Sequence, residues 1–177
     1  MYTFRRLAIK YYPFLIFGLI VLFLVVLVKR KDENHYSNGK YKYSVDFPDG
    51  WVKDHAKPRE ISYKSPDIVP VSEEPEAAIT IVIDERYDDI DLAGHYNIIA
   101  RDLSQAGVRI LSDGRDILAT KEAVWVEFQD VNGLQQHVWY FAFNRTKKLL
   151  IIQYRVSTNY IEKYRGTFKH FLESFKI

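Results

Sequence analysis

The hydrophobic and polar positions first show a strand that ends abruptly. In the segment YKYSVDF, residues 41–47, apolar and polar side chains alternate, which is the period of a half-buried β-strand. Pro48 then removes a backbone N–H from the ladder, and Asp49 and Gly50 supply turn chemistry. The strand therefore ends there. Trp51 follows the turn, where a large ring can fold back over the end of a core.

Five further segments have the composition of strands. Residues 61–64 (ISYK) form a short one, and a Pro-rich acidic loop follows at residues 65–76. Residues 77–84 (AAITIVID) carry isoleucine at alternate positions with β-branched residues between them, a pattern compatible with burial on both faces. Three more strands are expected at residues 123–129, 136–143 and 149–156. Their short connections, one of which contains Asn132-Gly133, predict an antiparallel meander.

Two segments have the period of an amphipathic helix. In residues 92–107 apolar side chains recur at steps of three and four, with Asp91 placed to cap the start and Gly107 to end the helix. A second helix runs from residue 160 to about 175, where Asn159 and Glu162 have the spacing of a capping box.

The remaining segment, residues 108–119, contains Ser112-Asp113-Gly114 and is either a tight hairpin or one strand with a kink. Two amphipathic helices and an antiparallel sheet must bury their apolar faces against each other. The pattern therefore predicts an α+β fold in which helices flank an antiparallel β-sheet.

A long apolar segment precedes this domain. Residues 11–28 contain no charge and are bracketed by three Lys or Arg on each side, and their length is near the roughly 17 to 25 residues that cross a bilayer. The run is longer than a signal-peptide core, and it meets Lys-Arg-Lys where a cleavage site should stand. The chain is therefore expected to comprise a basic tail (1–10), an uncleaved single-pass transmembrane anchor (11–28), a linker (29–39) and a domain (40–177).

Charge and cysteine content limit the possible partners. The flanking charges of the anchor are balanced, and the N-terminal amine favours a cytoplasmic N-terminus and an extracytoplasmic domain. The whole chain has a net charge of +2, but residues 40–177 hold 19 basic and 21 acidic residues. Such a domain lacks the basic footprint of a nucleic-acid binder. With no cysteine in the chain, a lipidated N-terminal cysteine is excluded.

Four stretches of residues 40–177 resemble the PsbP-like family, which is named for an extrinsic subunit of the photosynthetic oxygen-evolving complex. They are the opening YSVDFPDGW, the helix LAGHYNIIARDL, the Trp- and Tyr-rich meander and the closing FKHFLESF. The resemblance implies an α/β/α sandwich and a non-catalytic protein that binds or stabilises other proteins. Pro48, Gly50 and Trp51 match the family as fold-determining residues. The membrane anchor stands where a plant relative carries a transit peptide, which argues against a photosynthetic role.

No residue pattern in the chain predicts catalysis, a cofactor or a metal. The acidic run 84–91 lacks the sixth-position Gly and twelfth-position Glu of a calcium loop. The histidines lack zinc-ligand spacing, which leaves open a pair that is brought together only by folding. No Gly-x-Ser-x-Gly elbow or phosphate-cradling loop is present. The histidines are His35, His55, His95, His137 and His170. The motif Asn144-Arg145-Thr146 fits a glycosylation acceptor, which would matter only in a eukaryotic secretory route, and a hairpin turn is a sufficient explanation of it.

Aromatic residues of the meander are the candidate binding surface. Trp125, Trp139 and Phe141 lie on adjacent strands, and an exposed aromatic patch there would bind a partner, unless helices cover both faces of the sheet. The sequence thus predicts a membrane-anchored, non-catalytic binding or assembly domain whose partner is another membrane or extracytoplasmic protein. The alternative is a ligand-binding or hydrolytic domain that uses a pocket between sheet and helices.

Overall fold

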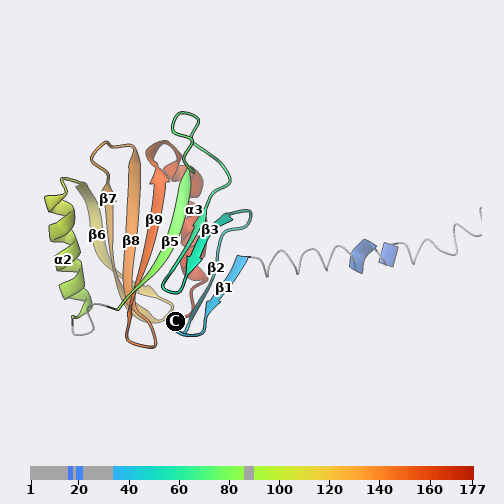
Figure 1. Ribbon diagram of the computed structural model, residues 1–177, viewed down its shortest axis with the longest axis horizontal. Coiled ribbons are helices and arrows are strands. Elements are labelled where there is room, and N and C mark those ends of the chain that lie inside the picture. Colours follow the sequence, from blue (N-terminus) through green and yellow to red (C-terminus); the bar gives the residue numbers. More distant parts are fainter. Residues whose placement is uncertain (1–15, 18, 22–33, 86–89) are drawn as a thin grey trace, which may run out of the picture. The chain divides into compact units, whose positions relative to one another are not determined.

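A seven-stranded antiparallel sheet forms the centre of the domain (Figure 1). The computed structural model describes residues 16–17, 19–21, 34–85 and 90–177. The spatial order of the strands is β3-β4-β5-β9-β8-β7-β6. Their bounds are β3 Val52–Lys57, β4 Glu60–Lys64, β5 Ala77–Asp84, β6 Arg109–Leu118, β7 Lys121–Gln129, β8 Gln135–Phe143 and β9 Leu149–Ser157. A separate two-stranded sheet pairs β1 (His35–Asn38) with β2 (Tyr43–Asp46).

One helix packs on each face of the seven-stranded sheet. Helix α2 (Leu92–Gln105) contacts β6, β7 and β8, whereas α3 (Ile161–Glu173), which follows a short 3-10 turn η1 (Thr158–Tyr160), packs on β9. Side chains along β7 point alternately to the two faces of the sheet, and each face has its own hydrophobic cluster. Ala123 belongs to the cluster on the α3 face, whereas Val124 and Val126 belong to the cluster on the α2 face. The α+β prediction with helices on both faces is confirmed.

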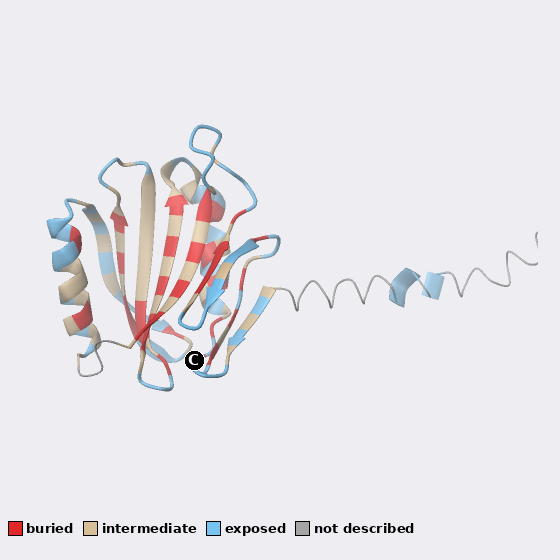
Figure 2. Ribbon diagram, viewed as in Figure 1, coloured by how far each residue is buried: buried red, intermediate tan, exposed pale blue. Residues whose placement is uncertain are grey.

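A single helix is too narrow to cover a face of this sheet. Seven strands spaced about 4.8 Å apart span roughly 30 Å, while a helix with its side chains is about 10 to 12 Å across. Helix α2 covers the β6 side of one face, and α3 with Phe47 and Trp51 covers the β4, β5 and β9 side of the other. Strand β8 remains mostly half-buried, as Figure 2 shows. Half of each sheet face is therefore left without a helix.

Strand β2 and the residues that flank it are buried in the predicted alternation. Tyr41, Tyr43, Val45 and Phe47 are each at most 4% exposed, but the strand pairs with β1 and bridges Lys176 instead of joining the large sheet. Residues 29–39, which were expected to be a linker, thus contain a strand.

The turn after this strand has the expected conformation. Gly50 adopts a φ of +78°, and the backbone N–H of Trp51 donates to the carbonyl of Pro48 at 3.2 Å. The Trp51 ring is 8% exposed and meets Tyr164 edge-on at 5.9 Å between ring centroids. The tryptophan therefore covers the core between the turn and α3.

The predicted ends of α2 are confirmed. Asp91 accepts a hydrogen bond from the backbone N–H of Gly94 at 2.7 Å. At the other end Gly107 has a φ of +74°, and the N–H groups of Gly107 and Val108 donate to the carbonyls of Ser104 and Leu103. This is the Schellman arrangement, which requires a left-handed residue at that position.

The capping box predicted for the second helix is wrong. The 3-10 turn moves the N-cap of α3 to Tyr160, and no side chain caps it. Asn159 therefore lies one residue outside the cap, and Glu162 pairs instead with Arg165 at 2.7 Å.

A buried carboxylate fixes α3 to the start of β5. Glu76 is 6% exposed. It accepts hydrogen bonds from the ammonium of Lys163 and from the hydroxyl of Tyr164, the latter at 2.9 Å. These contacts hold the first turn of α3 against the sheet because a buried carboxylate needs charged or hydrogen-bonding partners.

Two features of the sheet were resolved only by the structure. Residues 109–118 form one strand, with a register shift between Ile110 and Ser112, so the kinked-strand alternative holds. Strand β3 was not predicted because its side chains are almost all exposed at the sheet edge. Most of the predicted anchor at 11–28 lies outside the described residues, and none of the helices that are described is long and apolar enough to span a membrane.

Candidate functional site

The two uncovered half-faces of the sheet form hollows of different chemistry. The hollow beside α3, here called the aromatic groove, has a volume of about 590 Å³. The hollow on the opposite face, here called the polar face, has a volume of about 530 Å³. Principal residues of the aromatic groove are Asp116, Leu118, Trp125, Glu127, Gln136, Val138, Tyr140, Tyr154, Arg165, Phe168 and Lys169. Principal residues of the polar face are Ser62, Lys64, Thr80, His137, Trp139, Gln153 and Arg155.

The floor of the aromatic groove is a pair of stacked rings on β7 and β8. Trp125 pairs with Tyr140 across the two strands, and their rings lie 6.3 Å apart at an interplanar angle of 25°. Gly114 on β6 is the next residue across the sheet. A Cβ there would lie 3.1 Å from the Trp125 ring, a tight contact, so the glycine leaves room for the indole.

The wall of the groove is formed by α3. Phe168 stacks on Tyr154 with 4.3 Å between ring centroids and 8° between ring planes, and it meets Tyr140 at 6.1 Å. Tyr154 is 4% exposed, and among the described residues its hydroxyl has no hydrogen-bond partner. Burial raises the pKa of the Tyr154 phenol. It therefore stays protonated at neutral pH and is a hydrogen-bond donor.

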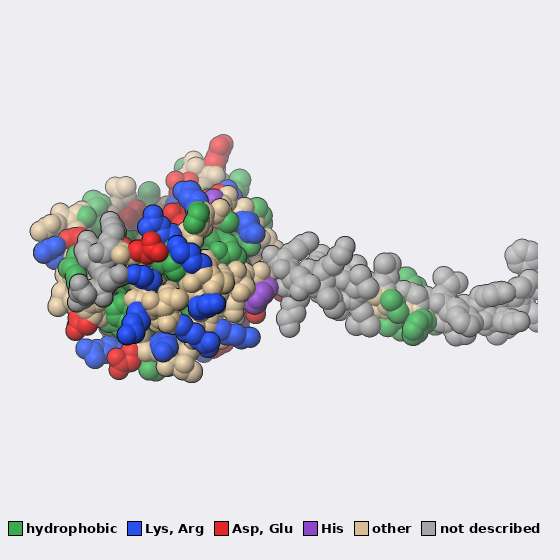
Figure 3. Space-filling model, turned by 60° about the horizontal axis from the view of Figure 1, so that its bottom comes forward, with side chains coloured by type: hydrophobic (Ala, Val, Ile, Leu, Met, Phe, Trp, Pro, Cys, Tyr) green, Lys and Arg blue, Asp and Glu red, His purple; other side chains and the backbone are tan. Residues whose placement is uncertain are grey.

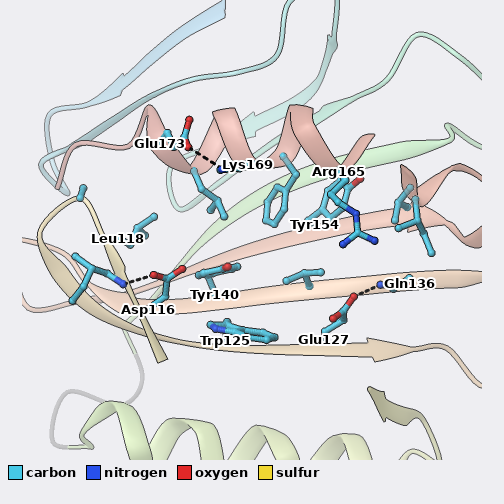
Figure 4. A pocket seen from close by; sticks show the side chains of 17 residues that line it. Asp116, Leu118, Trp125, Glu127, Gln136, Tyr140, Tyr154, Arg165, Lys169 and Glu173 are labelled. Atoms are coloured by element: carbon cyan, nitrogen blue, oxygen red, sulfur yellow. Dashed lines mark hydrogen bonds and ion pairs between the residues drawn. The ribbon is translucent and has the colours of Figure 1, made fainter. Parts of the chain in front are cut away.

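Charged side chains form the rims of the groove (Figure 4). On the sheet side, Glu127 accepts hydrogen bonds from Ser112 at 2.7 Å and from the amide of Gln136. Burial, together with the carboxylates of Asp116 and Glu127, raises the pKa of Tyr140 to about 12. The sheet rim is thus acidic and supplies phenolic donors.

The helix rim is basic but already paired. Arg165 binds Glu162 at 2.7 Å, and Lys169 lies 3.9 Å from Glu173. Both cations are more than two-thirds exposed, so water screens their charge. The groove as a whole is an aromatic cleft with tyrosine side chains in its lining and charged groups of both signs at its rims.

The side chains of the polar face lie in parallel rows that run across β4, β5, β9 and β8. The hydroxyls of Ser62 and Thr80 lie 2.9 Å apart, and Thr80 pairs in register with Gln153, which pairs with Trp139. In the adjacent row His137 stacks on Phe128 at 4.8 Å. Burial and the nearby Arg155 lower the pKa of His137. At neutral pH this face thus presents an uncharged imidazole beside a half-buried tryptophan.

Folding brings His55 between two carboxylates that sequence spacing did not indicate. Its ring nitrogens lie 3.1 Å from Asp54 and 2.6 Å from Glu60. These contacts, with Asp54 the larger contributor, raise the pKa of His55. Within the described part of the chain, no group of three or more His, Cys, Asp or Glu side chains is arranged to hold a metal. Residues 86–89 of the acidic run lie outside that part.

The predicted aromatic patch is divided between the two faces of the sheet. Trp125 lies in the aromatic groove and Trp139 on the polar face, whereas Phe141 is fully buried beneath α2. The expectation of one patch built from these three residues is therefore corrected. A two-residue turn at Asn132-Gly133 fixes a register in which Trp125 pairs with Tyr140. In that register Trp139 points to the other face of the sheet from Trp125, so the sequence did contain a signal for this division.

The glycosylation motif forms a hairpin turn between β8 and β9. Asn144 is 3% exposed, and its side-chain oxygen accepts from the backbone N–H groups of Thr146 and Lys148. An Asx turn of this kind uses the side chain as part of the backbone fold. The turn explanation is therefore the one that the structure supports.

Basic side chains gather on the end of the domain where this hairpin turns (Figure 3). The same end carries the turns β3–β4 and β6–β7, as the strand registers require. Some of the charges are neutralised, since Lys40 and Arg59 approach Glu85 at 3.6 and 3.2 Å. These exposed side chains keep the end of the domain hydrated, and Lys40 and Arg59 do not line either hollow.

Comparison with known proteins identifies the fold. No family model and no curated protein matches the chain. Among solved structures, cyanobacterial PsbP (CyanoP) from Synechocystis aligns with a TM-score of 0.60 and 15% identity, over 81% of this chain and 91% of that one. The chain has a PsbP-like fold.

Two other structures share the PsbP-like fold. LpqN, described as involved in cell envelope biogenesis of Mycobacterium tuberculosis, has a TM-score of 0.54 and 12% identity, over 76% of this chain and 82% of that one. A protein of unknown function from Pseudomonas aeruginosa has a TM-score of 0.50 and 19% identity, over 76% and 90%. At these identities the likeness concerns the fold alone.

Proposed function

We propose that the protein is a single-pass membrane protein, anchored by residues 11–28, whose PsbP-like domain is a non-catalytic accessory module that binds a protein partner through the polar face. The partner is a membrane or extracytoplasmic protein. One observation carries the proposal: a half-face of the sheet lies open beside α2 and presents Trp139, His137 and Arg155. Tryptophan and arginine are enriched among the residues that contribute most to protein interfaces.

Other features support this assignment. The apolar run with its basic flanks favours a membrane anchor. The side chains of the polar face hydrogen-bond or pair with one another, as Ser62 does with Thr80 and Arg155 with Glu74 at 3.2 Å. Polar side chains held in place by such contacts could form the rim of an interface, with Trp139 as its central aromatic residue and complementary polar atoms supplied by the partner.

The test is affinity purification of the full chain from detergent extracts with two matched variants. Gln153→Arg places a charge in the middle of the polar face, and Gln105→Arg places the same charge on the exposed end of α2. We expect wild type and Gln105→Arg to retain a stoichiometric partner, and Gln153→Arg to lose it. A wild-type chain that repeatedly purifies alone, or a Gln153→Arg variant that keeps the partner, would contradict the proposal.

Membrane orientation requires its own measurement. A C-terminal reporter that is active only in the cytoplasm should be inactive, and one that is active only outside should work. The opposite pair of results would place the domain in the cytoplasm and change the class of partner.

A further inference from the structure

We propose that the aromatic groove is a binding site for a small uncharged molecule with a flat apolar body and a carbonyl oxygen that accepts a hydrogen bond from Tyr154. The groove and the polar face lie on opposite faces of the sheet. This inference is therefore independent of the protein partner proposed above.

The hydroxyl of Tyr154 is the observation that points to a ligand. It is buried, the Tyr154 side chain lines the groove, and among the described residues the hydroxyl has no hydrogen-bond partner. An unpaired buried hydroxyl is unfavourable for folding, and a phenylalanine would keep the stacking contact with Phe168 without this penalty. An acceptor atom that reaches the hydroxyl from the groove would satisfy it, and the phenol stays protonated because burial raises its pKa.

The walls of the groove define the rest of the ligand. Trp125 and Tyr140 form a nearly parallel pair at 25°, and Phe168 lines the α3 side. Planar ring systems pack well on such surfaces. The volume of about 590 Å³ is within the range of roughly 300 to 1,000 Å³ that is usual for small-molecule sites.

The charges around the groove disfavour an anionic ligand. Asp116 and Glu127 on the sheet rim oppose an anion, while Arg165 and Lys169 are exposed and paired with glutamates of their own helix. An uncharged carbonyl oxygen can accept from Tyr154 without bringing a charge next to either rim. Ketones, esters and amides share this acceptor.

The test uses the full chain in detergent with its tryptophan indoles labelled with ¹⁵N. The chain has three tryptophans, and they occupy three environments: Trp125 the aromatic groove, Trp139 the polar face and Trp51 the core. The probe is 2-acetylnaphthalene, and the matched compound that lacks the acceptor is 2-ethylnaphthalene. We expect the acetyl compound to shift the Trp125 indole signal saturably and to leave Trp51 and Trp139 nearly unchanged.

The hydrogen bond is tested by a double-mutant cycle with Tyr154→Phe. Removing either the carbonyl or the hydroxyl should weaken binding by about 2- to 10-fold, the effect of one neutral hydrogen bond, and removing both should weaken it no further. The Trp51 and Trp139 signals report whether the variant is folded. Equal shifts of Trp125 and Trp139 would indicate partition into the detergent and overturn the site. If the ratio of the affinities for 2-acetylnaphthalene and 2-ethylnaphthalene is the same in Tyr154→Phe as in wild type, the proposed role of the hydroxyl is overturned.

Discussion

Two tyrosines of the core should respond in opposite ways to the same substitution. Tyr154 and Tyr164 are 4% and 5% exposed, and replacement by phenylalanine removes one hydroxyl from each. The hydroxyl of Tyr164 donates to the buried carboxylate of Glu76 at 2.9 Å, whereas that of Tyr154 has no partner among the described residues. The pair therefore isolates the effect of a satisfied hydroxyl from that of an unsatisfied one.

The expected magnitudes follow from those contacts. A hydrogen bond to a charged group contributes about 1.5 to 3 kcal/mol, and its loss also leaves Glu76 with fewer partners. We expect Tyr164→Phe to destabilise the domain by about 2 kcal/mol. An unsatisfied buried hydroxyl costs about 1 to 3 kcal/mol, part of which is recovered on its removal. Tyr154→Phe should therefore stabilise the domain by about 1 kcal/mol.

Urea unfolding of residues 36–177, followed by tryptophan fluorescence, measures the difference. This fragment contains the whole of both hydrophobic clusters. With a slope of about 1.5 kcal/mol per molar urea, a gap of about 3 kcal/mol separates the two midpoints by about 2 M. The reasoning is refuted if Tyr154→Phe loses more than about 1 kcal/mol, because its hydroxyl would then have a bound water or another partner.

Three further outcomes are expected. Trp51→Ala should lose about 3 to 5 kcal/mol, measured by urea unfolding, because a nearly buried indole leaves a cavity; normal stability with loss of a partner would contradict this structural role. Gly107→Ala should lose about 1 to 2 kcal/mol because its φ is left-handed, whereas Gly166→Ala in α3, where the added methyl meets open space, should not destabilise. By NMR titration, the pKa of His55 should exceed 6.5 and that of His137 should lie below it.

The two histidine pKa shifts give opposite pH dependences of stability. Because the pKa of His55 is raised, its contribution is fully present below pH 6.5 and is lost as the pH rises through the folded pKa. Because the pKa of His137 is lowered, its contribution is present above pH 6.5 and is lost as the pH falls from there through the folded pKa. His55→Gln and His137→Gln, compared in urea unfolding between pH 5 and 8, should each remove one of these slopes and leave the other.

Local sequence signals were reliable where a single contact decides the structure. Asp91 caps α2 and Gly107 ends it because a side-chain acceptor and a left-handed residue act within one turn. The alternation in β2 also held. By contrast, Gly114 suggested a turn inside residues 108–119, but it is a strand residue that leaves space for the ring of Trp125. The ring beside this glycine is eleven residues away along the chain.

The sequence by itself determined both helices of the domain, most of its strands, the antiparallel meander and the need for helices on both faces, because these follow from periodicity, caps and short turns. Only the tertiary structure decided which halves of the sheet the helices cover. That choice depends on where α2 and α3 pack, and it buried Phe141 while leaving Trp125 and Trp139 half-exposed on opposite faces. It also left the hydroxyl of Tyr154 buried beside the groove, because the width of seven strands exceeds what one helix covers.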